Sequence, residues 1–133
     1  MIEHRPPRVS WDAVPFWEGC DREELLLERC TSCGTVNWFP RRFCVACGSD
    51  VVEWLPATGH GTIESFSHVH RPINESYADE VPYVLALVRI DEGPMFVTRI
   101  VGDDAISATI GDDVVVRFVE TTGARLPVFT LAP

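Results

Sequence analysis

Two pairs of cysteines give this sequence its strongest chemical signal. Cys30 and Cys33 form one CxxC pair, Cys44 and Cys47 form a second, and a glycine follows each pair. A CxxC turn directs two thiolates at one ion, and the glycine permits the positive φ that the turn needs. Two such turns supply four sulfurs in a tetrahedron, which suits Zn²⁺, although iron in a rubredoxin-like site fits the same spacing. Because four protein ligands leave no open position, we predict one structural Zn²⁺.

Other uses of these cysteines fit the sequence less well. Two disulfide bonds would require an oxidising compartment, and the first residues contain no apolar stretch typical of a secretory signal. A redox-active CxxC would need only one pair. The fifth cysteine, Cys20, has no partner in this pattern, and we interpret it as a small apolar core residue.

No set of residues typical of a self-sufficient enzyme is visible, and we predict no catalytic residue in this chain. The motifs G-x-S-x-G and H-E-x-x-H and a glycine-rich phosphate loop are all absent. All eleven basic residues are arginine, so a lysine Schiff base and a lysine general base are excluded within this sequence.

Three polar clusters are weaker candidates. His60, His68 and His70 lie close together and could bind a metal or move a proton. Arg71, next to His70, could meet an anionic group such as a nucleotide phosphate. The segment Arg41-Arg42-Phe43 lies between the cysteine pairs, where an exposed tip could touch a phosphate or an acidic partner. For each cluster the simpler interpretation is a solvated or ion-paired surface.

Length and charge narrow the possible classes of function. The 133 residues predict one domain or one small domain with an appendage, and the apolar content of 46% is enough for a core. The net charge of −9 argues against broad binding to nucleic acid, which needs cations against phosphates. No run of about 18 apolar residues is present, so no membrane-spanning helix is predicted and we expect a cytoplasmic protein.

The pattern along the chain divides it into three parts. Residues 1–28 form a helical segment in which Ser10 could cap a first short helix, Pro15 could begin a second, and Gly19 could end it. Its aromatic residues must pack either on the protein itself or on a partner. Residues 29–55 form the zinc ribbon. Residues 56–133 contain five closely spaced predicted strands, which favours a small closed barrel because closure removes exposed edges.

The order of these parts resembles the DUF35 family. The resemblance is carried by Pro15-Phe16-Trp17-Glu18-Gly19, by Leu26 to Cys30, by the two cysteine pairs, by Gly59 to Phe66, by His70-Arg71-Pro72 and by Pro82-Tyr83, and it extends from about Val14 to Leu131. It implies a mainly β fold of short N-terminal helices, a rubredoxin-like zinc ribbon and a C-terminal five-stranded OB-fold barrel. It also implies that Cys30, Cys33, Cys44 and Cys47 are the zinc ligands.

The resemblance further implies a function beside a larger catalyst. Members of this family work with thiolase-like or lipid-transfer-protein-type subunits on acyl-CoA thioesters, and some of these pairs are retro-aldolases of steroid or bile-acid side-chain degradation. The expected assembly is a heterotetramer. Within it, His70, Arg71, Tyr83, Phe16 and Trp17 would lie at the CoA or acyl channel or at the partner interface.

A different class of function shares the same predicted architecture. OB barrels and zinc ribbons also occur in modules that bind single-stranded nucleic acid. Residues 74–133, however, hold ten acidic residues against four arginines, with Tyr77 and Tyr83 as the nearest candidates for stacking on bases. The charge therefore favours the accessory subunit over the nucleic-acid-binding module.

Overall fold

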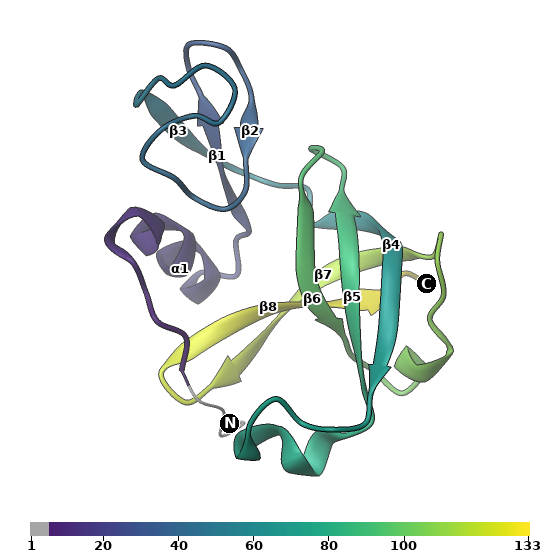
Figure 1. Ribbon diagram of the computed structural model, residues 1–133. Coiled ribbons are helices and arrows are strands. Elements are labelled where there is room, and N and C mark those ends of the chain that lie inside the picture. Colours follow the sequence, from purple (N-terminus) through teal and green to yellow (C-terminus); the bar gives the residue numbers. More distant parts are fainter. Residues whose placement is uncertain (1–5) are drawn as a thin grey trace.

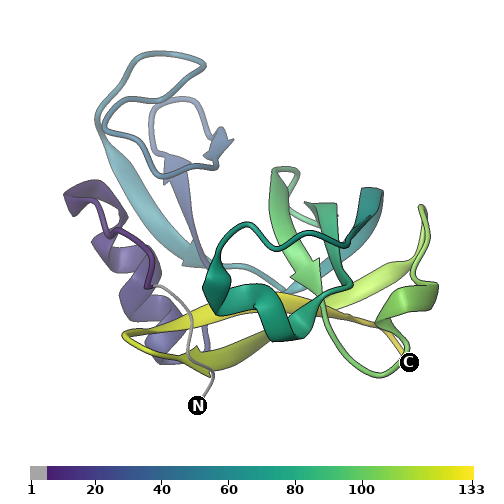
Figure 2. The same ribbon diagram turned by 60° about the horizontal axis from the view of Figure 1, so that its bottom comes forward.

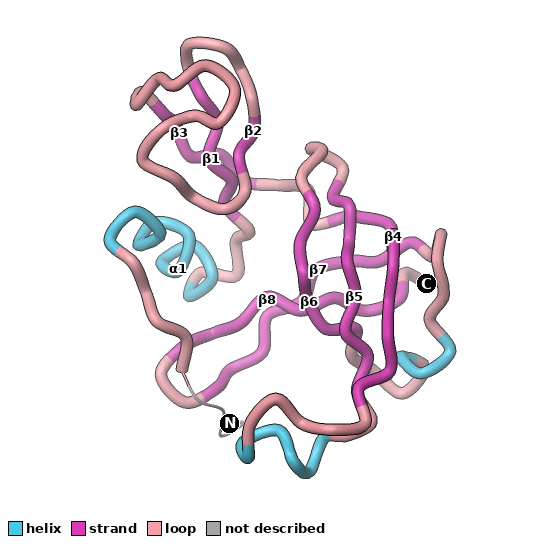
Figure 3. The backbone as a smooth tube through the Cα atoms, viewed as in Figure 1, coloured by secondary structure: helices cyan, strands magenta, loops and turns pink. Residues whose placement is uncertain are grey.

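The computed structural model describes residues 6–133 and divides into a helical segment, a zinc ribbon and a β-barrel (Figure 1). Figure 3 shows that strands dominate the chain and that the helices are short. The helical elements are η1 (Trp11–Ala13), α1 (Val14–Asp21), η2 (Glu75–Glu80) and η3 (Ala105–Ser107). The ribbon strands are β1 (Leu26–Cys30), β2 (Val36–Asn37) and β3 (Val52–Pro56). The barrel strands are β4 (His60–Val69), β5 (Tyr83–Ile90), β6 (Met95–Ile100), β7 (Asp113–Thr121) and β8 (Ala124–Leu131).

The barrel is closed in the order β4-β5-β6-β8-β7, which confirms the predicted five-stranded architecture. Strands β4, β5 and β6 form an antiparallel meander, and β7 pairs with β8 along the whole hairpin from Val114↔Leu131 to Thr121↔Ala124. Closure between β6 and β8 is parallel and rests on one registered pair, Ile100↔Phe129. The two strands therefore diverge on one side of this pair, and the far end of the β7–β8 hairpin extends away from the barrel (Figure 1).

Alternating side chains fill the barrel as their spacing predicts. On β5, Val84, Ala86, Val88 and Ile90 are buried, and on β6 the buried side chains include Phe96 and Ile100. The last strand begins at Ala124, because Gly123, with φ of +84°, lets the chain reverse next to Thr122.

The ribbon is a three-stranded antiparallel sheet in the order β2-β1-β3, with β1 in the centre. Strand β1 begins within the Leu25-Leu26-Leu27 run and ends at Cys30, so one apolar strand leads directly into the first metal ligand. Leu25 and Leu27 are buried in the same core cluster as the barrel residues. Shared apolar packing therefore holds the ribbon against the barrel.

Helix α1 begins as predicted, with Pro15 in its first turn, but its C-terminal end differs from the prediction. The Ser10 side chain makes no capping hydrogen bond, and the chain passes from η1 directly into α1, with Pro15 in the first turn. Gly19 lies inside the helix and does not end it. A Cβ atom at this position would lie 2.8 Å from the Leu26 side chain, so the glycine permits the close approach of β1. Figure 2 shows α1 between the ribbon and the β7–β8 hairpin, where Arg125 donates a hydrogen bond to the Asp21 carbonyl.

Within residues 6–133, no helix has the length and apolar character needed to cross a bilayer.

Candidate functional site

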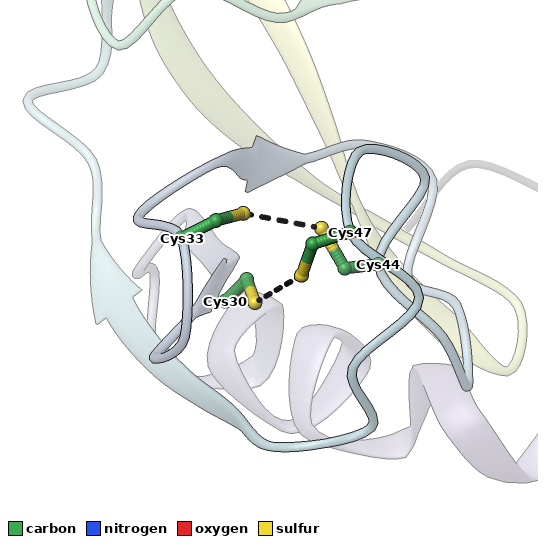
Figure 4. Close-up of side chains that lie close together, drawn as sticks. All are labelled: Cys30, Cys33, Cys44 and Cys47. Atoms are coloured by element: carbon green, nitrogen blue, oxygen red, sulfur yellow. Dashed lines mark hydrogen bonds between the residues drawn. The ribbon is translucent and has the colours of Figure 1, made fainter.

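The four paired cysteines converge at the end of the ribbon, where all four sulfurs lie within 4.8 Å of one another (Figure 4). The Sγ atoms of Cys30 and Cys47 are 3.5 Å apart, and those of Cys33 and Cys44 are 3.6 Å apart. Four sulfurs at about 2.3 Å from a tetrahedral Zn²⁺ would be about 3.8 Å from one another. The donors and their spacing therefore fit one zinc ion.

Both cysteine turns have the backbone geometry that their glycines predict. The N–H of Gly34 donates to the Cys30 carbonyl at 2.8 Å, and that of Gly48 donates to the Cys44 carbonyl at 2.9 Å. Each glycine has a φ of +79°. The two turns thus repeat one local structure, and each presents its pair of sulfurs to the same point.

The electrostatics of the sulfurs also favour a cation at their centre. The Asn37 side chain and the backbone N–H groups of Ala46 and Cys47 lower the pKa of Cys44 to about 6. A backbone hydrogen bond from Ser49 lowers the pKa of Cys47, but the neighbouring thiols and desolvation together raise it to about 12. Four adjacent thiolates repel one another, and a bound divalent cation removes that repulsion.

Asn37 lies behind the metal centre and is an unusual buried residue. It is 3% exposed, and neither polar atom of its side-chain amide has a hydrogen-bond partner among residues 6–133. The amide is nevertheless the largest of the influences that lower the pKa of Cys44. The side-chain amide of Asn37 is therefore a free hydrogen-bond donor beside the Cys44 sulfur. This arrangement fits a metal-bound thiolate, which accepts hydrogen bonds more strongly than a neutral thiol does.

A second feature is an apolar groove of about 540 Å³ between the ribbon, α1 and the barrel. Its walls come from three segments that are distant in sequence. Trp38 of the ribbon stacks on Phe96 of β6 with ring centroids 4.1 Å apart, and Phe16 of α1 lies 4.6 Å from Trp38 and 5.1 Å from Trp17. These rings join the three parts of the protein and form one side of the groove.

One end of this groove is polar. The Arg99 guanidinium lies 4.7 Å from the ring centroid of Tyr83 and 5.7 Å from that of Tyr77, and its Nη1 donates to Glu80 Oε1 at 2.7 Å. Burial raises the pKa of Tyr77. Arg99 is the only charged side chain that lines the groove among the described residues.

The candidate residues from the sequence separate into two groups. Phe16, Trp17 and Tyr83 line the groove together. His70 and Arg71 are exposed and are not among the residues that line it.

The remaining candidate clusters lie on the surface or in the core. His60 and His68 are exposed on β4, and Arg41, Arg42 and Phe43 are exposed on the ribbon. Cys20 is fully buried, and desolvation raises its pKa to about 12, which agrees with its interpretation as an apolar core residue.

Sequence reasoning missed the groove residues Trp38, Phe96 and Arg99. Trp38 belongs to a short irregular stretch, and Phe96 is one of several apolar residues in its strand. Arg99 is the one charged residue of β6, which was the available signal.

Two family models match consecutive parts of the chain. The family described as "ChsH2, rubredoxin-like zinc ribbon domain" matches residues 17–53, and "ChsH2, C-terminal OB-fold domain" matches residues 54–119. The first match includes all four cysteines of the metal centre. The centre is accordingly that of a rubredoxin-like ribbon with one structural Zn²⁺.

Curated relatives and a solved structure are similar over most of the chain. A probable enoyl-CoA hydratase alpha subunit of Thermomonospora curvata is 33% identical over 92% of this chain. A 3-oxo-4,17-pregnadiene-20-carboxyl-CoA hydratase alpha subunit of Mycobacterium tuberculosis is 28% identical over 86%. The matches span 38% and 36% of these two longer proteins. A structure titled "Ltp2-ChsH2(DUF35) aldolase" superposes with a TM-score of 0.86 at 33% identity, covering 96% of this chain and 100% of the matched chain.

Proposed function

Because this chain belongs to the ChsH2 (DUF35) family, which joins a rubredoxin-like zinc ribbon to an OB fold, we propose that it is the accessory subunit of a heteromeric thiolase-like enzyme. The assembly would act on acyl-CoA thioesters. The reaction that we propose is the retro-aldol cleavage of a carbon–carbon bond in a steroid or bile-acid side chain, with the catalytic residues on the partner.

The names of the similar proteins support this proposal. The matched structure is titled an aldolase and contains a DUF35 chain, and the two curated relatives described above are named as a probable and a further alpha subunit of hydratases of CoA thioesters. The thioester named for the second relative carries a pregnadiene, which is a steroid ring system. The aldolase is the better guide to the reaction, because its matched chain is covered completely, whereas the hydratase subunits are more than twice as long as the matched region.

The observation that carries the proposal is the exposed apolar rim of the groove. Ile73 is 75% exposed, Val97 72% and Phe39 65%, and all three line the same groove. Single exposed apolar residues are ordinary, but a group of them around an apolar depression marks a surface that a protein partner covers. We propose that the partner subunit docks on this rim.

Docking at the rim would give the candidate residues different roles. Phe16, Trp17 and Tyr83 would form the wall of an acyl channel that the partner closes, because they line the groove from this chain's side. His70 and Arg71 would act outside the channel, at the edge of the interface, where an exposed arginine can meet a CoA phosphate. This division follows from their positions in the fold.

The groove also disfavours the nucleic-acid alternative. A surface that follows a nucleic-acid strand needs several cations along its length. In the described part of the chain, Arg99 is the single cation that lines this groove, and Glu80 is hydrogen-bonded to it.

Reconstitution with a thiolase-fold partner tests the proposed function. The tagged chain is purified from its native host, the proteins that accompany it are identified by mass spectrometry, and the thiolase-like partner is then expressed with it. We expect a heterotetramer by light scattering and retro-aldolase activity only when both chains are present. Full turnover by the isolated chain, or no association with a thiolase-fold protein, would refute the proposal.

A matched pair of variants tests the docking surface. Val97→Asp places a charge on the groove rim, whereas Ile110→Asp places the same charge on a similarly exposed residue (63%) that does not line the groove. We expect the first variant to weaken the complex by at least about tenfold and the second to leave it unchanged. Equal effects of the two variants on the affinity of the complex would show that the partner does not dock on the groove rim.

A further inference from the structure

A second cavity, of about 340 Å³, adjoins the apolar groove and contains two arginines. It lies against one face of the β7–β8 hairpin. The register pairs Arg117 with Val128 and Val119 with Leu126, so these four side chains share that face. Arg99 of β6 and Glu80 of η2 form the opposite side.

The two arginines retain hydrogen-bonding capacity. Nη1 of Arg99 donates a hydrogen bond to Glu80. Nε of the same arginine is buried and has no hydrogen-bond partner among residues 6–133. Arg117 is exposed and makes no ion pair within the same described residues. A buried donor without an acceptor is costly, and an oxyanion held by the free side of the Arg99 guanidinium would satisfy it.

The charge of this cavity differs from that of the chain. Arg99 and Arg117 supply two positive charges and Glu80 supplies one negative charge, which leaves an excess of one positive charge in a protein of net charge −9. One excess positive charge matches a monoanion such as a carboxylate better than a phosphate dianion. The cavity therefore favours a carboxylate.

The cavity and the groove adjoin each other. Tyr77, Arg99, Leu126 and Val128 line both of them. A molecule that lies in the apolar groove therefore reaches residues that also line the cavity, and Arg99 is one of them. The groove volume lies within the range of pockets for drug-sized ligands, so the apolar part of that molecule can be large.

We propose that this chain binds an apolar carboxylic acid, with the carboxylate between Arg99 and Arg117 and the apolar body in the groove. The ligand is a free acid and needs no partner subunit, so this inference goes beyond the proposed function. It assigns to the chain a binding site of its own. Two kinds of molecule share this chemistry, namely flexible fatty acids and acids with fused rings.

The first test compares an acid with its neutral analogue. The zinc-loaded full chain is titrated with 1-pyrenebutyrate and with 1-pyrenebutanol, and binding is followed by pyrene anisotropy and by quenching of the tryptophans. Because Trp17 and Trp38 line the groove, a ligand there should quench them. We expect the acid to bind at least about fivefold more tightly than the alcohol, with an advantage that decreases as salt increases. Equal affinities would refute the role of the arginines.

Two matched variants test whether the charge of Arg117 contributes to binding of the carboxylate. Arg117→Gln removes the exposed arginine of the cavity, and Arg89→Gln makes the same change on β5, where the arginine pairs with Glu64 outside the cavity. We expect Arg117→Gln to weaken binding of the acid by roughly fivefold and binding of the alcohol by less than twofold. Arg89→Gln should change neither affinity. An equal loss for both variants would show only an effect of net charge and would overturn the site.

Competition experiments distinguish the two kinds of acid, flexible fatty acids and acids with fused rings. Displacement of the probe by laurate alone identifies a flexible chain, and displacement by deoxycholate below its micellar concentration identifies fused rings, so either result supports the proposal. Displacement by inorganic phosphate, or by neither acid, would overturn it. These measurements use the isolated chain, so a failure here leaves reconstitution with a thiolase-fold partner as an independent test of the proposed function.

Discussion

Replacement of Phe16 by alanine should separate internal docking of the N-terminal aromatics from docking on a partner. Phe16 is 3% exposed and lies in the chain of rings between Trp17 and Trp38. Loss of a fully buried phenylalanine ring costs about 3–5 kcal/mol, because apolar contacts are lost and a cavity remains. The two ring contacts, at about 0.5–1.5 kcal/mol each, are part of that cost. For a chain of this size, the midpoint of thermal unfolding should fall by roughly 10–20 °C.

The assay is urea unfolding of the zinc-loaded chain, followed by far-ultraviolet circular dichroism. This probe is preferable to fluorescence, because Trp17 and Trp38 contact the mutated ring and their emission changes for local reasons. Zinc content is measured for each variant, so that a loss of metal is not mistaken for a loss of packing.

A neighbouring aromatic residue supplies the matched control. Trp11 lies five residues earlier and is 72% exposed. Trp11→Ala should change the free energy of unfolding by no more than about 0.5 kcal/mol. A loss below about 1 kcal/mol for Phe16→Ala, or equal losses for the two variants, would refute the assignment of Phe16 to the core.

Three further predictions concern the metal centre and the buried thiol. Cys33→Ser should release zinc and unfold the ribbon; retention of one zinc per chain by elemental analysis, with unchanged thermal unfolding, would contradict a structural role for the metal. Asn37→Leu should weaken zinc binding by roughly 10–100-fold in competition with a chelator, because the donor beside Cys44 is lost, and unchanged affinity would exclude that contact. The pKa of Cys20 is about 12 in the folded protein against an ordinary value of 9.0, so its stabilising contribution is complete below pH 9 and declines as the pH rises toward 12. Cys20→Ala should flatten this alkaline decline in urea unfolding, and an identical decline in the variant would assign it to other groups.

The metal centre and most of the barrel could be predicted from local pattern. The spacing of Cys30, Cys33, Cys44 and Cys47 defines two turns, and the glycine after each turn adopts the positive φ that the prediction requires. Alternation along residues 83–90 indicates which side chains face the core, because successive residues on a strand point to opposite faces. Such signals depend only on neighbours in the sequence.

The C-terminal end of the N-terminal helix was less predictable for a physical reason. Glycine is a common helix terminator, and Gly19 was interpreted in that way, yet it lies within α1, where Leu26 packs closely against it. Ser10 occupies the N-cap position of η1, but its side chain makes no capping hydrogen bond. At Gly19 the contact with a tertiary neighbour outweighs the local preference.

Local sequence pattern is enough to define a four-cysteine metal centre, a five-stranded barrel and an acidic chain without lysine. The groove depends on tertiary packing, because Phe16, Trp38 and Phe96 come from three segments and meet when the helix and the ribbon pack on the barrel. The same packing brings Arg99 and Arg117 to one cavity, although they lie on β6 and β7, two strands that do not pair with each other. Local periodicity indicates which face of a helix or strand is buried. It does not indicate which side chains meet in a groove, because that depends on contacts between segments that are distant in the sequence.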